Sequence, residues 1–293
     1  MSRKILIIGG TGFIGNALAK QFAKLGDDVT LFHREMQIAS LENLNLSHIL
    51  GDRKEPVPAL RSQRFDFVID TCGFSPEDFL ILDFLNTEHY IFISSVGVYS
   101  KFISPFSDER GAKIDEELSN LSLDFDKFNK HEKYGFLKLK SEEHIRMNFS
   151  NCSVVRPSIV LGKNENTGRL RKIYQLPKTD SKIPLNSANK FQFIDILDLA
   201  ALITKVVEMP PGGDYNLVGP SLSWQEFVST FIETFEIENY LPVHDVTDFP
   251  FWDDYPNQGI RSLVSQHSWI TEHKFTSLAD SLTMFKLGFE KFY

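Results

Sequence analysis

Cysteine is scarce in this sequence of 293 residues, which contains only Cys72 and Cys152. Two cysteines in strand-like apolar surroundings form no CxxC pair, so they predict reduced, buried thiols rather than a disulfide framework or a zinc site. The eight histidines form no HExxH or HxH pattern, and no GxSxG motif occurs. The sequence therefore predicts no metal site and no serine hydrolase.

The chain also has fewer positively than negatively charged residues. Lys and Arg number 31 against 39 Asp and Glu, giving a net charge of −8, which argues against a general nucleic-acid partner. No uncharged apolar run approaches the roughly 18 residues that span a bilayer. The apolar start of the chain is broken by glycines from Gly9 onward, with no cleavage site of a signal peptide. We therefore expect a cytoplasmic protein without a membrane partner, acting on a small molecule.

What the sequence does contain is a regular alternation of strand and helix patterns in its first half. With 42% hydrophobic and 24% charged residues, the chain can bury a large core, in which the 26 phenylalanines should be prominent. Strands are predicted at residues 4–8, 29–33, 48–50, 67–70, 89–94 and 153–156, and helices at 13–25, 76–86 and 132–148. This order predicts an α/β fold with a doubly wound parallel sheet.

The pattern changes after residue 157, where prolines become frequent. Helices are predicted at 196–208, 224–235 and 278–289. We expect residues 1–157 to form a Rossmann core that binds NAD(P), with 196–208 returning to it. Residues 158–293 should mostly form a smaller, substrate-binding lobe.

A glycine-rich segment joins the first predicted strand to the first predicted helix. Residues 10, 12 and 15 form GxGxxG, the spacing that permits a tight turn, close approach of the backbone to a pyrophosphate, and close packing of helix on strand. The helix N-terminus then offers N–H groups to the phosphates. The predicted contacts to the dinucleotide are Gly9, Thr11, Gly12, Phe13, Ile14 and Gly15.

The second predicted strand ends at His33-Arg34-Glu35, where NAD-binding proteins place an acidic residue on the ribose. His33 occupies that position, and the Arg34 guanidinium suits a 2′-phosphate, so NADP is preferred over NAD. Glu35 supports the alternative, since it reaches the ribose if the strand ends one residue later. Further predicted cofactor contacts follow the third and fourth strands: Asp52, beside the adenine, Arg53, Thr71, Cys72 and Gly73.

Candidate catalytic groups follow in order along the chain. Ser94 and Ser95 end the fifth predicted strand, at the sheet edge where such folds bind ligands. Tyr134 and Lys138 form YxxxK, which places both side chains on one face of the long helix, where the ammonium stabilises a phenolate. A second YxxxK begins at Tyr174, but it contains Pro177 and lies outside the predicted core.

Together these motifs resemble the extended, epimerase/dehydratase-like branch of the short-chain dehydrogenase/reductase superfamily. Ser94 to Tyr99 is similar to that family's S-S-x-x-V-Y segment, residues 156–162 to R-P-x-x-V-x-G, and residues 193–200 to F-I-D-V-x-D-L-A. Residues 216–220 and the last predicted helix fit the substrate lobe. The resemblance implies a catalytic Ser95, Tyr134 and Lys138, with Ser94, Tyr134 and Lys138 also near the cofactor. It further implies that Pro157 and Ser158 border the nicotinamide.

The sequence also departs from this family pattern. No acidic residue follows Ser95, where sugar dehydratases carry one, and Ser158 and Ile159 replace the Asn of many nucleotide-sugar epimerases. These departures favour a reductase-like member of the family. Val96 and Arg169 are candidate substrate contacts. An NAD-retaining epimerase is the second hypothesis, and a non-catalytic dinucleotide sensor or RNA-associated protein the third. Residues 100–130 form either a substrate lid or a solvated insertion, and a homodimer is an assembly that the family allows.

Overall fold

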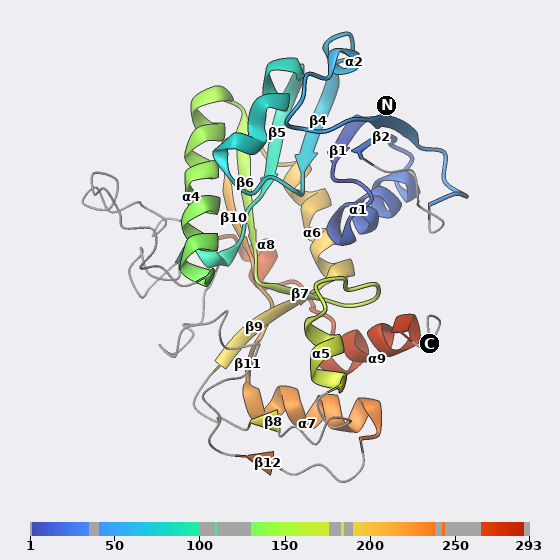
Figure 1. The fold of residues 1–293 in the computed structure, drawn as a ribbon, viewed down its shortest axis with the longest axis vertical. Coiled ribbons are helices and arrows are strands. Elements are labelled where there is room, and N and C mark those ends of the chain that lie inside the picture. Colours follow the sequence, from blue (N-terminus) through green and yellow to red (C-terminus); the bar gives the residue numbers. More distant parts are fainter. Residues whose placement is uncertain are drawn as a thin grey trace, which may run out of the picture.

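The computed structural model describes residues 2–34, 41–99, 109, 130–175, 183–184, 190–237, 242–243 and 265–289. A seven-stranded sheet of order β10-β6-β5-β4-β1-β2-β3 dominates these residues, and each neighbouring pair is parallel (Figure 1). Its strands are β1 (Lys4–Ile8), β2 (Asp28–His33), β3 (Ser47–Leu50), β4 (Phe65–Asp70), β5 (Thr87–Ile93), β6 (Cys152–Pro157) and β10 (Asp214–Leu217). The predicted α/β fold with a doubly wound parallel sheet is thereby confirmed, and six strands were predicted to within two residues.

Helices cover both faces of this sheet (Figure 1). Ile5 and Ile7 of β1 pack in one apolar cluster with α1 (Phe13–Lys24) and α6 (Ile196–Val207). Leu6 and Ile8 point the other way, into a cluster with the 3₁₀ helix η1 (Pro76–Phe84) and α4 (Lys130–Asn148). The short helix α2 (Pro58–Arg61) lies near η1. Because both faces are covered, the strands are apolar without alternation.

Local sequence explains where these helices begin. Asp78 in the first turn of η1 accepts hydrogen bonds from the backbone N–H groups of Phe74 (2.9 Å) and Ser75 (3.1 Å). Asp195 caps α6 by accepting from Leu197 N at 2.8 Å. Such caps satisfy N–H groups that the first helical turn leaves unpaired. The segment predicted as a helix at 76–86 is thus helical, but as 3₁₀ turns.

The second part of the chain has its own aromatic core. A three-stranded sheet, β11 (Ser221–Ser223), β9 (Lys190–Asp195) and β7 (Ile159–Leu161), lies beside α5 (Arg169–Gln175), α7 (Trp224–Phe235) and α9 (Leu278–Phe289) (Figure 1). Trp224, Phe227 and Phe231 are fully buried there. The remaining short elements are β8 (Ile183–Pro184), which pairs with β12 (Pro242–Val243), and α8 (Ser268–Thr271).

One expectation about this part was wrong. Residues 216–220 were expected in the substrate lobe, but Asn216 and Leu217 belong to β10, which pairs with β6 at the edge of the large sheet. Ile270 of α8 also packs in the apolar cluster of α1 and α6. Among the described residues, none of the helices combines the length and apolar character that a membrane crossing requires.

Candidate active site

The glycine-rich loop between β1 and α1 is tightly folded. Gly9 has φ +79°, a left-handed conformation that favours glycine, and its N–H donates to Phe32 O at 2.9 Å. Gly12 N donates to Gly9 O at 3.0 Å. Thr71, at the end of β4, donates through Oγ1 to Ile8 O at 2.9 Å. A Cβ on Gly15 would stand 2.2 Å from Gly9 O, so only glycine lets α1 approach the loop this closely.

The N-terminus of α1 is suited to an anion. Gly12 is the N-cap, without a side-chain hydrogen bond, and the first turn contains no acidic residue. The N–H groups at such a terminus, together with the helix dipole, attract phosphate. The loop and α1 therefore have the geometry of a pyrophosphate cradle.

A cavity of about 650 Å³ opens in front of this loop. The predicted cofactor residues that line it are Gly9, Thr11, Gly12, Phe13, Ile14, His33, Arg34, Asp52, Arg53, Thr71 and Cys72. It also has a wall that sequence analysis missed, formed by Asn166 and Thr167 from residues 162–168 between β7 and α5, here called the β7–α5 loop. No motif marks these residues, because only the fold brings them opposite the glycines.

At the end of β2, the two side chains expected to face the ribose behave differently. His33 is buried, and its Nε2 lies 2.9 Å from Nδ1 of His48 on β3. Arg34 is exposed at the edge of the cavity. Asp52 lines the same cavity and accepts from Lys54 N at 2.9 Å. Glu35, the alternative ribose contact, lies outside the described residues.

A buried ion pair forms the floor of this cavity. Arg53 donates to both oxygens of Asp70, at 2.6 and 2.8 Å, and Tyr90 OH donates to Asp70 at 2.6 Å. Burial opposes both charges, but their mutual attraction prevails: the pKa of Arg53 is raised, and the pKa of Asp70 falls to about 2. Arg53 therefore lines the cavity, but its guanidinium is already paired with the buried carboxylate of Asp70.

Cys72 corrects one expectation. It was predicted to be buried, but its side chain is exposed at the cavity, whereas Cys152 is buried as predicted. Arg53 Nη1 lies 3.1 Å from Cys72 Sγ. Although the residue is exposed, its sulfur is partly buried beside Arg53, and this desolvation together with the charge of Asp70 raises the pKa of Cys72 to about 11. The thiol is therefore protonated at neutral pH and is a poor nucleophile.

The predicted catalytic serine and tyrosine approach one another at Gly97. Ser95 follows β5, and its Oγ accepts from Gly97 N at 3.0 Å. A Cβ on Gly97 would lie 3.3 Å from both Ser95 Oγ and Tyr134 Cδ1. The short 3₁₀ helix η2 (Val96–Tyr99) thus packs its glycine between the two side chains. Tyr134 also contacts Phe74, with ring centroids 5.4 Å apart.

Lys138 lies one turn after Tyr134 on α4 and is buried. Its Nζ donates to Gly73 O at 2.6 Å and to Ile93 O at 2.9 Å. An ammonium has three N–H donors, and the described residues take two of them. Lys138 therefore joins the ends of β4 and β5 directly beside Ser94 and Ser95, which places its charge at the edge where the other predicted groups meet.

Ser94 belongs to a buried polar network that sequence analysis did not anticipate. Its Oγ donates to Glu142 at 2.5 Å, and Glu142 accepts two bonds from Arg156, at 2.6 and 3.0 Å. Arg156 also donates to Tyr99 OH, which donates to Asn216 Oδ1 at 2.8 Å. The network holds the serine turn against α4 and β6. Glu142 follows Lys138 by one turn on α4, a spacing that could have revealed it.

The remaining predicted residues lie around this edge. Pro157 ends β6, and Ser158 follows it with a buried Oγ that has no hydrogen-bond partner among the described residues. Val96 begins η2, next to Ser95. Arg169 begins α5 and contacts Thr167. Within residues 100–130, the structure describes Glu109 and Lys130; the rest lies outside it. Glu109 is buried and accepts from Asn216 N, Ser265 Oγ and Gln266 N.

No group of three metal-binding side chains occurs among the described residues. The glycine-rich loop, the cavity of about 650 Å³ in front of it, and Ser95, Tyr134 and Lys138 all lie at one edge of the parallel sheet.

Comparison with solved structures identifies the class of fold. WbmH of Bordetella bronchiseptica, solved in complex with NAD⁺, superposes with a TM-score of 0.73 at 17% identity and covers 100% of each chain. A variant of UDP-glucuronic acid 4-epimerase from Bacillus cereus, solved with NAD and a UDP-sugar analogue, gives 0.72 at 18% identity, covering 99% of this chain and all of the other. The protein therefore has the fold of extended short-chain dehydrogenase/reductase structures, as its motifs predicted.

Two sequence matches are shorter. Residues 4–55, from β1 through β3, match the model for pyridine nucleotide-disulphide oxidoreductases. The chloroplast stem-loop binding protein of 41 kDa b from Arabidopsis thaliana is 37% identical over 117 residues. That match covers 34% of this chain and only 31% of the relative.

Proposed function

We propose that this protein is an NAD(P)-dependent oxidoreductase that acts on a small carbonyl or alcohol through Ser95, Tyr134 and Lys138. The observation that supports the proposal is that Gly97 packs against both Ser95 and Tyr134. Lys138 donates to Ile93 O at the end of β5, on the same sheet edge as the glycine-rich loop. Ligands of parallel α/β sheets bind at this edge.

The residues present fit a nicotinamide dinucleotide. Glycine at positions 9 and 15 lets the loop pack closely, since a Cβ there would stand 2.7 Å from Thr71 Oγ1 or 2.2 Å from Gly9 O. The cavity of about 650 Å³ in front of the loop would hold the adenosine. At the other end, the Oγ of Ser158, which has no partner among the described residues, would offer a hydrogen bond to a carboxamide. Lys138, of whose three N–H groups the described residues take two, would donate the third to a ribose hydroxyl. Gly73 and Ser94 would flank the cofactor, but their polar groups already bind Lys138 and Glu142.

The chemistry then divides between cofactor and protein. The bound nicotinamide supplies or accepts the hydride. Tyr134 would donate a proton to the substrate oxygen, or take one from it, through its hydroxyl. Ser95 would orient that oxygen, with its own Oγ fixed by Gly97 N. The Lys138 ammonium would favour the phenolate electrostatically while positioned by two carbonyls.

Substitution of Tyr134 tests the chemistry. Tyr134→Phe keeps the ring that packs on Phe74 and Gly97 but removes the hydroxyl, so we expect turnover on a carbonyl panel to fall by about 10²–10⁴-fold. Binding of the reduced dinucleotide should remain within about twofold. Tyr174→Phe, in the other YxxxK segment, is the matched control and should keep full activity. Full activity in the Tyr134 variant would refute the assignment.

Cofactor choice is the second part of the proposal. Arg34 is exposed at the cavity edge, where its guanidinium suits the 2′-phosphate of NADP, and the buried His33 presents no carboxylate to repel it. We expect Arg34→Ala to weaken NADPH binding by about tenfold or more and leave NADH binding nearly unchanged. Equal losses for both, or tighter binding of NADH by the native protein, would contradict this choice.

An epimerase that retains NAD is the alternative for the same site. It is favoured by the structural neighbours, which include a UDP-glucuronic acid 4-epimerase solved with NAD. Such an enzyme should co-purify with dinucleotide and show no net change in cofactor absorbance. Release of bound nucleotide by acid, followed by chromatography, separates the two: a reductase should be isolated largely empty.

RNA binding is a further candidate, favoured by the name of the Arabidopsis relative. The net charge of −8 opposes it. Salt-sensitive binding of a stem-loop RNA in a mobility-shift assay would support it. For the oxidoreductase proposed above, we further propose a cytoplasmic location and a homodimer. Sedimentation of the purified protein tests the dimer.

A further inference from the structure

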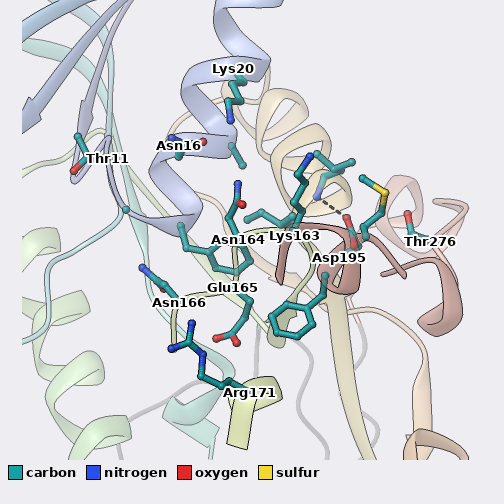
Figure 2. A pocket seen from close by; sticks show the side chains of 18 of the residues that line it. Thr11, Asn16, Lys20, Lys163, Asn164, Glu165, Asn166, Arg171, Asp195 and Thr276 are labelled. Atoms are coloured by element: carbon teal, nitrogen blue, oxygen red, sulfur yellow. Dashed lines mark hydrogen bonds between the residues drawn. The ribbon is translucent and has the colours of Figure 1, made fainter. Parts of the chain in front are cut away.

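A second cavity lies on the other side of the β7–α5 loop from the cavity in front of the glycine-rich loop. It measures about 760 Å³ and is bounded by α1, this loop, the start of α6 and α9 (Figure 2). Cavities of this size hold small organic ligands. Thr11, Gly12 and Phe13 of the glycine-rich segment, and Asn166 of the loop, line both cavities.

Two lysines face each other across this cavity. Figure 2 shows Lys20 reaching from α1 toward the loop, and Lys163 reaching from the loop toward α1. Among the residues that the structure describes, neither ammonium has an ion pair or a hydrogen bond. Burial, and then the charge of Lys163, lower the pKa of Lys20, so the folded protein disfavours this pair of charges.

Among the described residues, no carboxylate in the cavity forms an ion pair with these lysines. Asp195 accepts from Leu197 N at 2.8 Å and from Ser281 Oγ at 2.6 Å, so each of its oxygens is held by a neutral donor. Glu165 binds Thr167 through Oε1. In Figure 2, Glu165 lies on the Arg171 side of the cavity, away from Lys20. The uncompensated positive charge is therefore concentrated near α1.

Part of the cavity wall is apolar. Leu197 is 63% exposed and Met284 36% exposed, although both are large hydrophobic side chains, and both line the cavity beside Phe285. An exposed apolar surface next to unpaired charge suits a ligand with one anionic and one organic end.

We propose that this cavity is a second ligand site, which binds a small organic phosphate monoester between Lys20 and Lys163. A phosphate dianion neutralises both ammonium groups, whereas a carboxylate neutralises one. The organic part would cover Leu197 and Met284. The site does not depend on the proposed function, since none of the predicted catalytic residues lines it.

The test is calorimetric titration of the full chain with glycerol 3-phosphate, in the presence and absence of saturating NADP. We expect saturable binding that persists when NADP is present. Lys20→Gln and Lys163→Gln should each weaken it about tenfold, and the matched control Lys24→Gln, an exposed lysine near the end of the same helix, should not. In the native protein, ligand should also raise the pKa of Lys20, followed by NMR of labelled lysine.

Three outcomes would overturn the proposal. Loss of binding in saturating NADP would place the phosphate on the glycine-rich loop. Unchanged affinity in both lysine variants would remove the proposed contacts. Equal displacement by acetate would contradict a site for phosphate. Each is independent of whether Tyr134 is catalytic, so failure here leaves the proposed function standing.

Discussion

Gly15→Ala is the perturbation whose effect the structure defines most closely. The added Cβ would stand 2.2 Å from Gly9 O, 2.7 Å from Gly10 Cα and 2.9 Å from Gly9 C. All three are backbone atoms, so no side-chain rotation relieves the overlap. Ordinary van der Waals contact requires α1 to move away from the loop by about 1 Å. That movement separates the N–H groups at the start of α1 from the backbone of the glycine-rich loop, so the two no longer face one phosphate position together.

Overpacking of this kind costs about 1–3 kcal/mol of folding stability. If the dinucleotide must restore the native spacing on binding, its affinity should fall by roughly ten- to a hundredfold. The assays are urea unfolding and titration with NADPH, followed by nicotinamide fluorescence.

Gly26→Ala is the matched control. Gly26 follows the other end of α1 with φ +83° and has no atom within 4 Å of the added Cβ. This substitution should cost about 1 kcal/mol through backbone conformation alone and leave NADPH binding unchanged. If Gly15→Ala binds NADPH as tightly as the native protein, the loop is not the phosphate site and the reasoning fails.

The remaining predictions concern stability. Arg156→Met should lower the free energy of unfolding by about 3–5 kcal/mol, because it leaves the buried Glu142 carboxylate without its cation. Adding Glu142→Leu should recover most of that loss. A urea midpoint that is no higher in the double variant than in the single variant would contradict this. Burial lowers the pKa of His89 from 6.5 to about 4, so the unfolded chain takes up the proton first. Stability should therefore be complete above pH 6.5 and fall by up to about 3 kcal/mol as the pH drops to 4. His89→Gln should flatten that dependence, and an unchanged slope would refute it.

The parallel sheet could be predicted because its signals are local. Strands such as β1 are short apolar runs, and α1, which follows β1, has an apolar face that buries Leu18, Ala19 and Phe22. The edge strand β10 was missed, since Asp214–Leu217 is short and partly polar, and its role comes from pairing with β6. Its assignment requires contacts that sequence spacing does not reveal.

The candidate site shows the same division. Gly15, Tyr134 and Lys138 follow from spacing along one loop or one helix. The Cys72 exposure, the turning of His33 toward His48, and the Asn166 wall depend on segments far apart in the chain. Glu142 is an intermediate case. Its position one helical turn after Lys138 can be seen in the sequence, but its hydrogen bond from Ser94 cannot.

The oxidoreductase and epimerase proposals both require that this chain binds a nicotinamide dinucleotide, and we expect it to do so at the glycine-rich loop. The most direct test is fluorescence titration of the native protein with NADPH and NADH, after any retained nucleotide has been removed and identified. We expect saturable binding, with NADPH bound more tightly than NADH, and enhanced fluorescence as the nicotinamide leaves water for the edge beside Lys138. Absence of saturable binding of either dinucleotide by folded, nucleotide-free protein would contradict it.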